Sequence, residues 1–154
     1  MTSRRDFLVA SGGLAGGLAL ARVPTPAHAT PAEASEAMRK VVGDAPVRPG
    51  KVKLTVPPLI DNGNSVALNV VVDSPMTPAD HVKAIHVFAE KNPQPYVVSV
   101  YLGPRAGRAT LATRVRLADT QKVVAIAALS DGSYWSDTAD VIVTLSACLE
   151  DGLI

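Results

Sequence analysis

The sequence predicts an all-β fold, an immunoglobulin-like β-sandwich of about seven strands, with one N-terminal helix after a cleaved signal peptide. Short segments that alternate apolar and polar residues follow one another through residues 47–145. Turn-forming clusters such as Asp61-Asn62-Gly63-Asn64 and Ser130-Asp131-Gly132 separate them. No stretch between these segments repeats apolar residues at helical spacing, and this combination is typical of a sandwich.

The first residues of the chain carry the features of a signal peptide. Arg4-Arg5 is followed by an apolar, glycine-rich run over 9–21 and then by the small residues Ala27-His28-Ala29. These three features in this order are typical of a twin-arginine export signal. The apolar run is shorter than the roughly 20 residues that a membrane-spanning helix needs. We therefore expect cleavage after Ala29 and a periplasmic protein. The alternative is the basic, amphipathic start of a cytosolic one.

The remaining residues are enough for one domain, because about 125 residues lie within the usual size range. We divide the chain into the signal peptide (1–29), a helix and linker (30–46), the sandwich (47–145) and a C-terminal arm (146–154). The whole chain has a formal net charge of +1, and no basic cluster remains after the leader. We therefore expect neither nucleic acid nor a membrane as a partner.

Residues 31–42 are predicted to form the N-terminal helix. Ala34, Met38 and Val41 recur at helical spacing and give the segment one apolar face. Gly43 then ends it.

The strand segments follow the helix at short intervals. They are 51–56, 66–72, 82–89, 96–102, 109–117, 122–129 and a last strand that includes Trp135 and 139–145. Leu, Ile and Val dominate them, so we expect an aliphatic core. Segment 82–89 could also form a helix through Ala84, Ile85 and Phe88, but its β-rich surroundings favour a strand. We interpret Phe88 and Trp135 as packing residues.

Cys148 is the only cysteine, and it lies in the last seven residues after the β-branched run 141–144. A single cysteine in an oxidising compartment cannot form an internal disulfide. It is then an inert buried thiol, half of an intermolecular bond or a reactive thiol. Chain ends are usually exposed, which argues against burial. We therefore interpret Cys148 as the working residue of the chain.

Other chemistry at this thiol fits the sequence less well. A blue-copper site needs a His and usually a Met shortly after the cysteine, and none follows Cys148. Zinc needs more Cys and His ligands than the chain supplies. His81 and His86 are five residues apart, so on one strand they should face opposite sides. The chain contains the Cys, His and Asn residues that a Cys–His–Asn hydrolase needs, but their presence alone is weak support for such an enzyme. We predict no catalytic residue, metal site or cofactor.

Several turn and strand-end segments together carry a resemblance to a known family. They are 61–64, 72–77, 85–93, 102–107, 113–118, Gln121 and 130–135. With the twin-arginine leader, they are similar to SoxY, the carrier protein of thiosulfate oxidation. The similarity covers nearly the whole chain after the leader.

The resemblance implies a carrier rather than an enzyme. SoxY proteins pair with SoxZ, a second small β-sandwich, and hold sulfur intermediates covalently on a cysteine near the C-terminus. By this resemblance Cys148 is the site of covalent sulfur attachment, and the sulfur adduct takes the place of a cofactor. Transient partners would be a SoxXA-like haem enzyme that loads thiosulfate, a SoxB-like dimanganese hydrolase that releases sulfate and a SoxCD-like sulfane dehydrogenase.

The tail departs from the family pattern on both sides of the cysteine. SoxY proteins carry Gly-Gly-Cys-Gly-Gly, or close to it, after the last strand. Here Cys148 is in register, four residues after Thr144, but the flanking glycines are absent and the tail is longer. The carboxylates of Glu150 and Asp151 disfavour a thiolate. Two alternatives therefore stay open: a divergent module that binds a SoxZ-like subunit without carrying sulfur, and dimerisation through Cys148.

Overall fold

The computed structural model describes residues 29–145. The predicted arm and all of the predicted signal peptide except Ala29 lie outside this range. Helix α2 comes first, and nine strands and a short 3-10 helix follow within the described residues. The elements are α2 (Pro31–Val42), β1 (Val47–Pro49), β2 (Val52–Thr55), β3 (Leu59–Ile60), β4 (Val66–Val72), β5 (Val82–Ala89), β6 (Tyr96–Tyr101), η1 (Pro104–Ala106), β7 (Ala109–Val115), β8 (Gln121–Leu129) and β9 (Tyr134–Val143).

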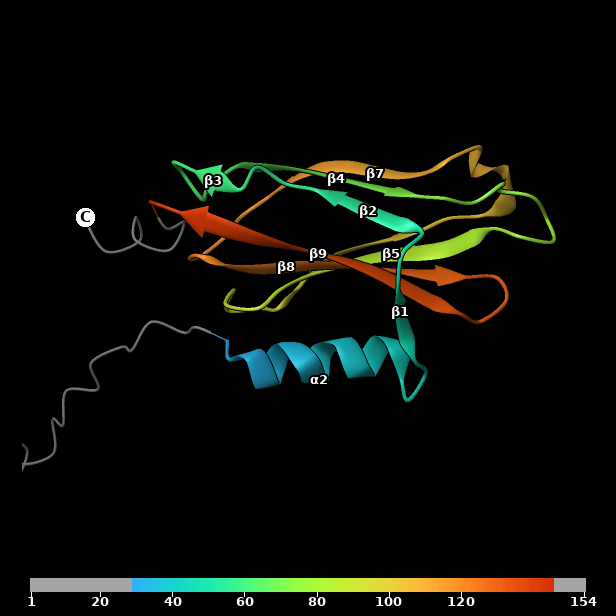
Figure 1. Ribbon diagram of the computed structural model, residues 1–154, viewed down its shortest axis with the longest axis horizontal. Coiled ribbons are helices and arrows are strands. Elements are labelled where there is room, and N and C mark those ends of the chain that lie inside the picture. The colour runs from blue at the N-terminus through green and yellow to red at the C-terminus, as the bar shows by residue number, and fades with distance from the viewer. Residues whose placement is uncertain (1–28, 146–154) are drawn as a thin grey trace, which may run out of the picture.

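The strands form two sheets packed face to face (Figure 1). The larger sheet has the order β1-β9-β8-β5-β6, with β3 also paired to β9, and the smaller has the order β2-β4-β7. Strands β1 and β3 run parallel to β9, whereas the other pairs are antiparallel. This arrangement confirms the predicted sandwich.

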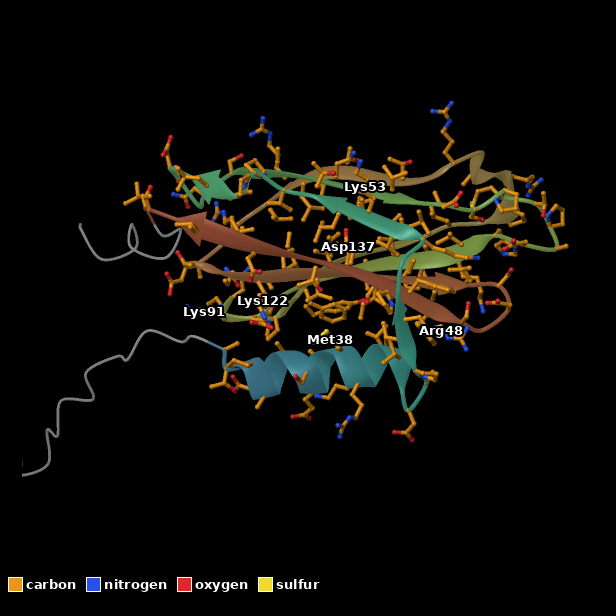
Figure 2. All side chains as sticks on the ribbon, viewed as in Figure 1. Met38, Arg48, Lys53, Lys91, Lys122 and Asp137 are labelled. Atoms are coloured by element: carbon orange, nitrogen blue, oxygen red, sulfur yellow. The ribbon has the colours of Figure 1, made fainter. Side chains whose placement is uncertain are left out.

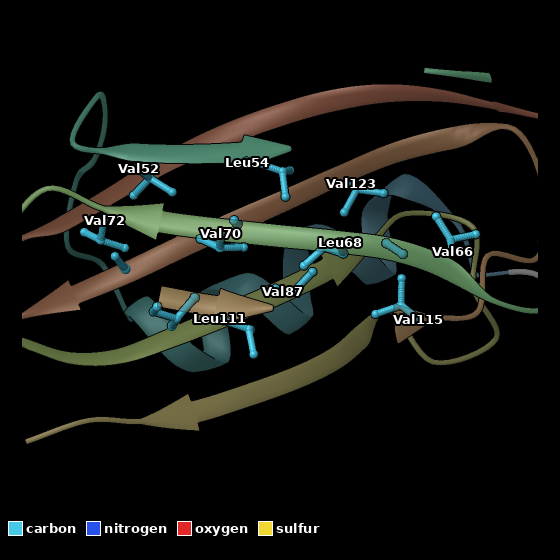
Figure 3. Close-up of a cluster of buried hydrophobic side chains, with 14 of the residues drawn as sticks. Val52, Leu54, Val66, Leu68, Val70, Val72, Val87, Leu111, Val115 and Val123 are labelled. Carbon is cyan, nitrogen blue, oxygen red and sulfur yellow. The ribbon is translucent and has the colours of Figure 1, made fainter. Parts of the chain in front are cut away.

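The core lies between the two sheets and is aliphatic (Figure 3). Along β4, every second residue points inward: Val66, Leu68, Val70 and Val72 are each at most 4% exposed. Val87 of β5 reaches the same interior from the larger sheet. Because side chains alternate faces along a strand, this period-2 pattern fixes which face of β4 is buried. Burying each such side chain contributes roughly 1.5–3 kcal/mol.

Segment 47–60 crosses from one sheet to the other and back. Strand β1 pairs with β9 at Tyr134–Ser136, β2 joins the smaller sheet, and β3 returns to pair with β9 at Ile142 and Val143. Between these pairings, the Asp137 carboxylate of β9 accepts a hydrogen bond from the Leu54 N–H of β2 at 2.8 Å. The sequence analysis missed β1 and β3, because three or two residues are too few for an alternating pattern to be recognised.

Helix α2 has the predicted bounds and covers the outer face of the larger sheet (Figure 1). A capping box begins it: the Thr30 hydroxyl accepts from the Glu33 N–H at 3.3 Å, and the Glu33 carboxylate accepts from the Thr30 N–H at 2.6 Å. Ala34 is fully buried, and Met38 lies between the helix and the sheet (Figure 2). Within residues 29–145, no helix has both the length and the apolar content needed to span a membrane.

Candidate functional site

The predicted attachment residue, Cys148, lies outside the described residues, which end at Leu145. The structure therefore defines the point from which the C-terminal segment departs. Strand β9 ends at Val143, beside β3 (Figure 1). The described chain thus stops three residues before the thiol.

Backbone and hydroxyl groups of neighbouring segments hold the end of β9 on both sides. We call the residues that supply them the clamp: Ile60, Asp61, Gly63 and Thr120. The Thr144 N–H donates to the Ile60 carbonyl at 2.9 Å, and the Thr144 hydroxyl lies 3.0 Å from the Asp61 carbonyl. The Gly63 N–H donates to the Leu145 carbonyl at 2.8 Å. On the other side, the Thr120 hydroxyl accepts from the Val143 N–H at 3.0 Å. The chain direction at Leu145 is therefore fixed.

Replacing Thr144 by valine is expected to weaken the clamp without changing side-chain shape. The variant loses the hydroxyl that donates toward the Ile60 and Asp61 carbonyls, so the free energy of unfolding should fall by about 1 kcal/mol. Urea denaturation measures this loss, and hydrogen exchange at the Gly63 amide should speed up. Thr138→Val is the matched control, because Thr138 is also exposed but its hydroxyl forms no hydrogen bond with the described residues. Equal losses in both variants would contradict a special role for Thr144.

Asn92 and Gln121 tie together two loops next to the clamp. The Asn92 side-chain carbonyl accepts from the Ala118 N–H at 2.9 Å and from the Gln121 amide at 3.0 Å. The Asn92 amide donates to the Arg116 carbonyl, and the Gln121 carbonyl accepts from the Lys91 N–H, both at 2.8 Å. Gln121 is 5% exposed, and these bonds satisfy its buried polar atoms. The sequence analysis used both residues only for the resemblance and missed this role. Gln121 lies in phase with the inward-facing apolar residues of β8, and a polar residue at such a position was the signal in the sequence that could have revealed its role.

Three exposed apolar side chains lie around the end of β9. Leu59 is 59% exposed, Ile142 is 55% exposed, and the two are register partners between β3 and β9. Leu145, the last described residue, is 43% exposed. Exposed apolar groups gathered at one place are typical of surfaces that contact other proteins.

A second polar cluster lies on the outer face of the larger sheet. His86 of β5 hydrogen-bonds through Nδ1 to the hydroxyls of Tyr96 and Ser99, which also bond to each other. The His86 ring meets Tyr101 edge-on, with centroids 6.0 Å apart. His86 is 5% exposed, and burial lowers its pKa, because a charged imidazolium is poorly solvated there.

The buried His86 predicts a pH-dependent stability. An unfolded His has a pKa of about 6.5, so around and below that pH the unfolded chain binds the proton more readily than the folded one. The contribution of neutral His86 is thus fully present above the unfolded pKa and is lost as the pH falls through the lowered, folded pKa. We expect the melting temperature to fall less in His86→Gln than in the unaltered protein between about pH 7.5 and pH 5. Equal falls would show that His86 is not the cause.

The expectation that His81 and His86 face opposite sides assumed that both lie on one regular strand, but β5 begins at Val82. Both histidines line one cavity of about 640 Å³ on the outer side of the larger sheet. Strand β5 also contains a β-bulge, where Val82 pairs with Leu129 but Ala84 pairs with Ala128. Lys83 is thus an extra residue, and it shifts the alternation of side chains by one position.

Potential metal ligands are scattered over the part of the chain that the structure describes. Within residues 29–145, His, Cys, Asp and Glu side chains form no group of three or more that could hold a metal ion.

The family of the chain follows from its sequence over most of its length. The model of the sulfur oxidation protein SoxY family matches residues 38–148. The chain belongs to the SoxY family. The match begins within α2, spans the whole sandwich and ends at Cys148. The family suggested by the sequence resemblance is therefore confirmed.

Solved structures similar to this SoxY-family chain support the fold. The sulfur carrier protein SoxY from Chlorobium limicola f. thiosulfatophilum shares 23% identity, with a TM-score of 0.63 over 74% of this chain and 98% of that chain. A superoxide reductase (neelaredoxin) from Ignicoccus hospitalis shares 15% identity, with a TM-score of 0.55 over 61% of this chain and 80% of that chain. A superoxide reductase from Nanoarchaeum equitans shares 11% identity, with a TM-score of 0.52 over 62% of this chain and all of that chain. At these identities the likeness shows the fold alone. No curated protein matches the sequence.

Proposed function

We propose that this SoxY-family protein is a periplasmic sulfur carrier without catalytic activity of its own. It holds thiosulfate-derived intermediates covalently on Cys148 and presents them to sulfur-oxidising enzymes. The observation that carries the proposal is the family match, which extends to Cys148, the only cysteine of the chain.

The clamp supports this role, because a carrier needs a fixed point from which its thiol is presented. Hydrogen bonds hold Thr144 and Leu145 against the clamp. An extended chain rises about 3.3 Å per residue, so Cys148, three residues beyond Leu145, reaches at most about 10 Å from Leu145. That length is enough to carry a sulfur atom beyond the sandwich into the active site of another protein. Ser146 and Ala147 have small side chains that suit a narrow channel.

Loading of the thiol is an oxidation that a partner must drive. Joining thiosulfate to the Cys148 thiol forms one sulfur–sulfur bond and releases one proton and two electrons. A haem enzyme of the SoxXA type would accept the electrons. Glu150 and Asp151 disfavour the thiolate, so spontaneous attack is suppressed and loading depends on the oxidising partner. SoxB-like and SoxCD-like enzymes would then act on the bound intermediate.

Partner binding would use surfaces next to the departure point of the tail and a sheet edge. Leu59, Ile142 and Leu145 offer apolar contact area to an enzyme that receives the tail. A SoxZ-like sandwich would form the stable heterodimer, because a second sandwich can cover an edge strand of this one.

Mass spectrometry of the C-terminal peptide tests the proposal. The full chain is incubated with thiosulfate and extract of thiosulfate-grown cells, and peptides containing Cys148 are weighed. We expect thiosulfonate, sulfonate or persulfide adducts on Cys148. A thiol reductant should remove every adduct that is attached to Cys148 through a sulfur–sulfur bond. The matched Cys148→Ser protein should carry none of them. A peptide that stays unmodified during growth on thiosulfate would refute the carrier role.

The altered tail favours one alternative, a binding module that pairs with a SoxZ-like subunit but carries no sulfur. Both candidates predict that the SoxZ-like subunit copurifies with the protein. They differ because only the carrier needs the thiol. Dimerisation through Cys148 is a further possibility, and a band at twice the mass on non-reducing gels that is lost on reduction would reveal it.

A further inference from the structure

The cavity on the outer face of the larger sheet has no part in the proposed carrier function. It lies beside the C-terminal end of α2 and has a volume of about 640 Å³. Its polar lining residues include Lys40, Lys83, His81, His86, Tyr101 and Tyr134. No Asp or Glu lines it among the residues that the structure describes. We propose that this cavity binds a small tetrahedral oxyanion, of the sulfate, thiosulfate or phosphate type.

Two β-bulges bring polar residues to this cavity. The first adds Lys83 to β5 between the inward-facing Val82 and Ile85, so Lys83 joins Ala84 on the outer side. The backbone carbonyl of Lys83 accepts a hydrogen bond from the Leu102 N–H at 2.8 Å, and this bond holds the bulge in place. Bulges re-aim side chains and are over-represented beside functional sites. A regular strand would direct Lys83 to the opposite face from Ala84.

The second bulge positions the hydroxyls that orient His86. Val87 pairs with Val98, but Phe88 pairs with Tyr96, so Val97 is the extra residue. Tyr96 and Ser99 therefore share the outer face, and both of their hydroxyls reach Nδ1 of His86. When a hydroxyl donates to Nδ1, the neutral ring carries its proton on Nε2. No other described side chain bonds to Nε2, so His86 can donate this N–H to a ligand in the cavity.

The charges around the cavity favour an anion over a cation or a neutral molecule. Lys83 has no ion-pair partner among the described residues. Lys40 pairs with Glu36 at 3.3 Å, but both side chains are more than 60% exposed, and such surface pairs are weak. An oxyanion accepts several hydrogen bonds at once, and lysines, tyrosine hydroxyls and an imidazole N–H are all donors. The lining thus matches the hydrogen-bonding needs of such a ligand.

Titration of the full chain with inorganic anions tests the proposal. The Cys148→Ser protein is used so that covalent adducts do not contribute, which keeps this test separate from that of the carrier function. Sodium sulfate, thiosulfate and phosphate are each added at constant ionic strength, with chloride as the reference anion. Calorimetry gives the affinity, and amide NMR shifts around Lys83 and Tyr101 give the location. We expect saturable binding of at least one oxyanion.

The matched variants are Lys83→Gln and Lys53→Gln. Lys53 lies on β2, in the smaller sheet and away from the cavity (Figure 2). Loss of one charge-assisted hydrogen bond at Lys83 should weaken binding about tenfold, whereas Lys53→Gln should leave it unchanged. Binding of sulfate or thiosulfate without phosphate would assign the ligand to the sulfur oxyanions, and binding of all three would assign a general oxyanion site. No saturable binding, or an equal loss in both variants, would overturn the proposal.

Discussion

Replacing Cys148 by serine is expected to abolish thiosulfate-dependent sulfur oxidation by cells that rely on this protein. Serine keeps the size of the side chain, but its hydroxyl cannot form the sulfur–sulfur bond that holds the cargo. In the proposed carrier function every later step acts on the bound intermediate, so the loss should be complete rather than partial. Thiosulfate consumption and sulfate production by a strain carrying the variant measure it.

The control for this experiment is Ser146→Ala, two residues away in the same tail. It changes one small side chain for another and should leave thiosulfate consumption near that of the unaltered strain. Copurification of a SoxZ-like subunit should be the same in both variants, because the proposed pairing uses an edge of the sandwich and does not need the thiol. Unchanged oxidation with Cys148→Ser would refute the carrier function and favour the binding module.

Replacing Phe88 by alanine should cause the largest loss of stability among single changes on the outer face of the larger sheet. Phe88 is 1% exposed, and its ring lies 5.3 Å from that of Tyr96. Neighbouring Val87 and Ala89 face the inter-sheet core, so Phe88 faces the side that α2 covers. Removing a fully buried phenyl ring should lower the free energy of unfolding by about 3–5 kcal/mol.

Urea denaturation of Phe88→Ala checks this expectation, with Val71→Ala as the control. Val71 is 41% exposed on the smaller sheet, so its truncation removes few contacts and should cost less than about 1 kcal/mol. A comparably small loss at Phe88 would mean that α2 does not form a packed layer on the sheet.

The regular elements could be predicted because their apolar pattern is local. Helix α2, β4 and β5 have the bounds that the sequence predicts, since helical or alternating spacing runs through their whole length. The bulges at Lys83 and Val97 could not be predicted, because each depends on the register of a strand with its neighbours. The expectation for His81 and His86 failed because it assumed one regular strand, whereas β5 begins at Val82 and contains the bulge at Lys83.

Part of the candidate site could likewise be predicted from the sequence, and part could not. Cys148 stands out in the sequence because it is the only cysteine and lies near the end of the chain. The clamp does not, because its hydrogen bonds join Thr144 to Ile60 and Asp61, more than 80 residues earlier. Asn92 and Gln121 likewise meet across 29 residues. The partners in such contacts follow from the fold as a whole, so the sequence alone does not reveal them.

The crossing of segment 47–60 has a mechanical consequence for the last strand. Strand β9 is flanked by β8 on one side and by β1 and β3 on the other. The hydrogen bonds of an antiparallel ladder lie across the strand axis, so a pull along β9 loads many of them together in shear. A partner that grips the chain beyond Leu145 and tugs along this axis must break these bonds collectively rather than unzip them one at a time. The end of β9 beside the clamp is therefore expected to resist fraying when the chain is pulled from that end.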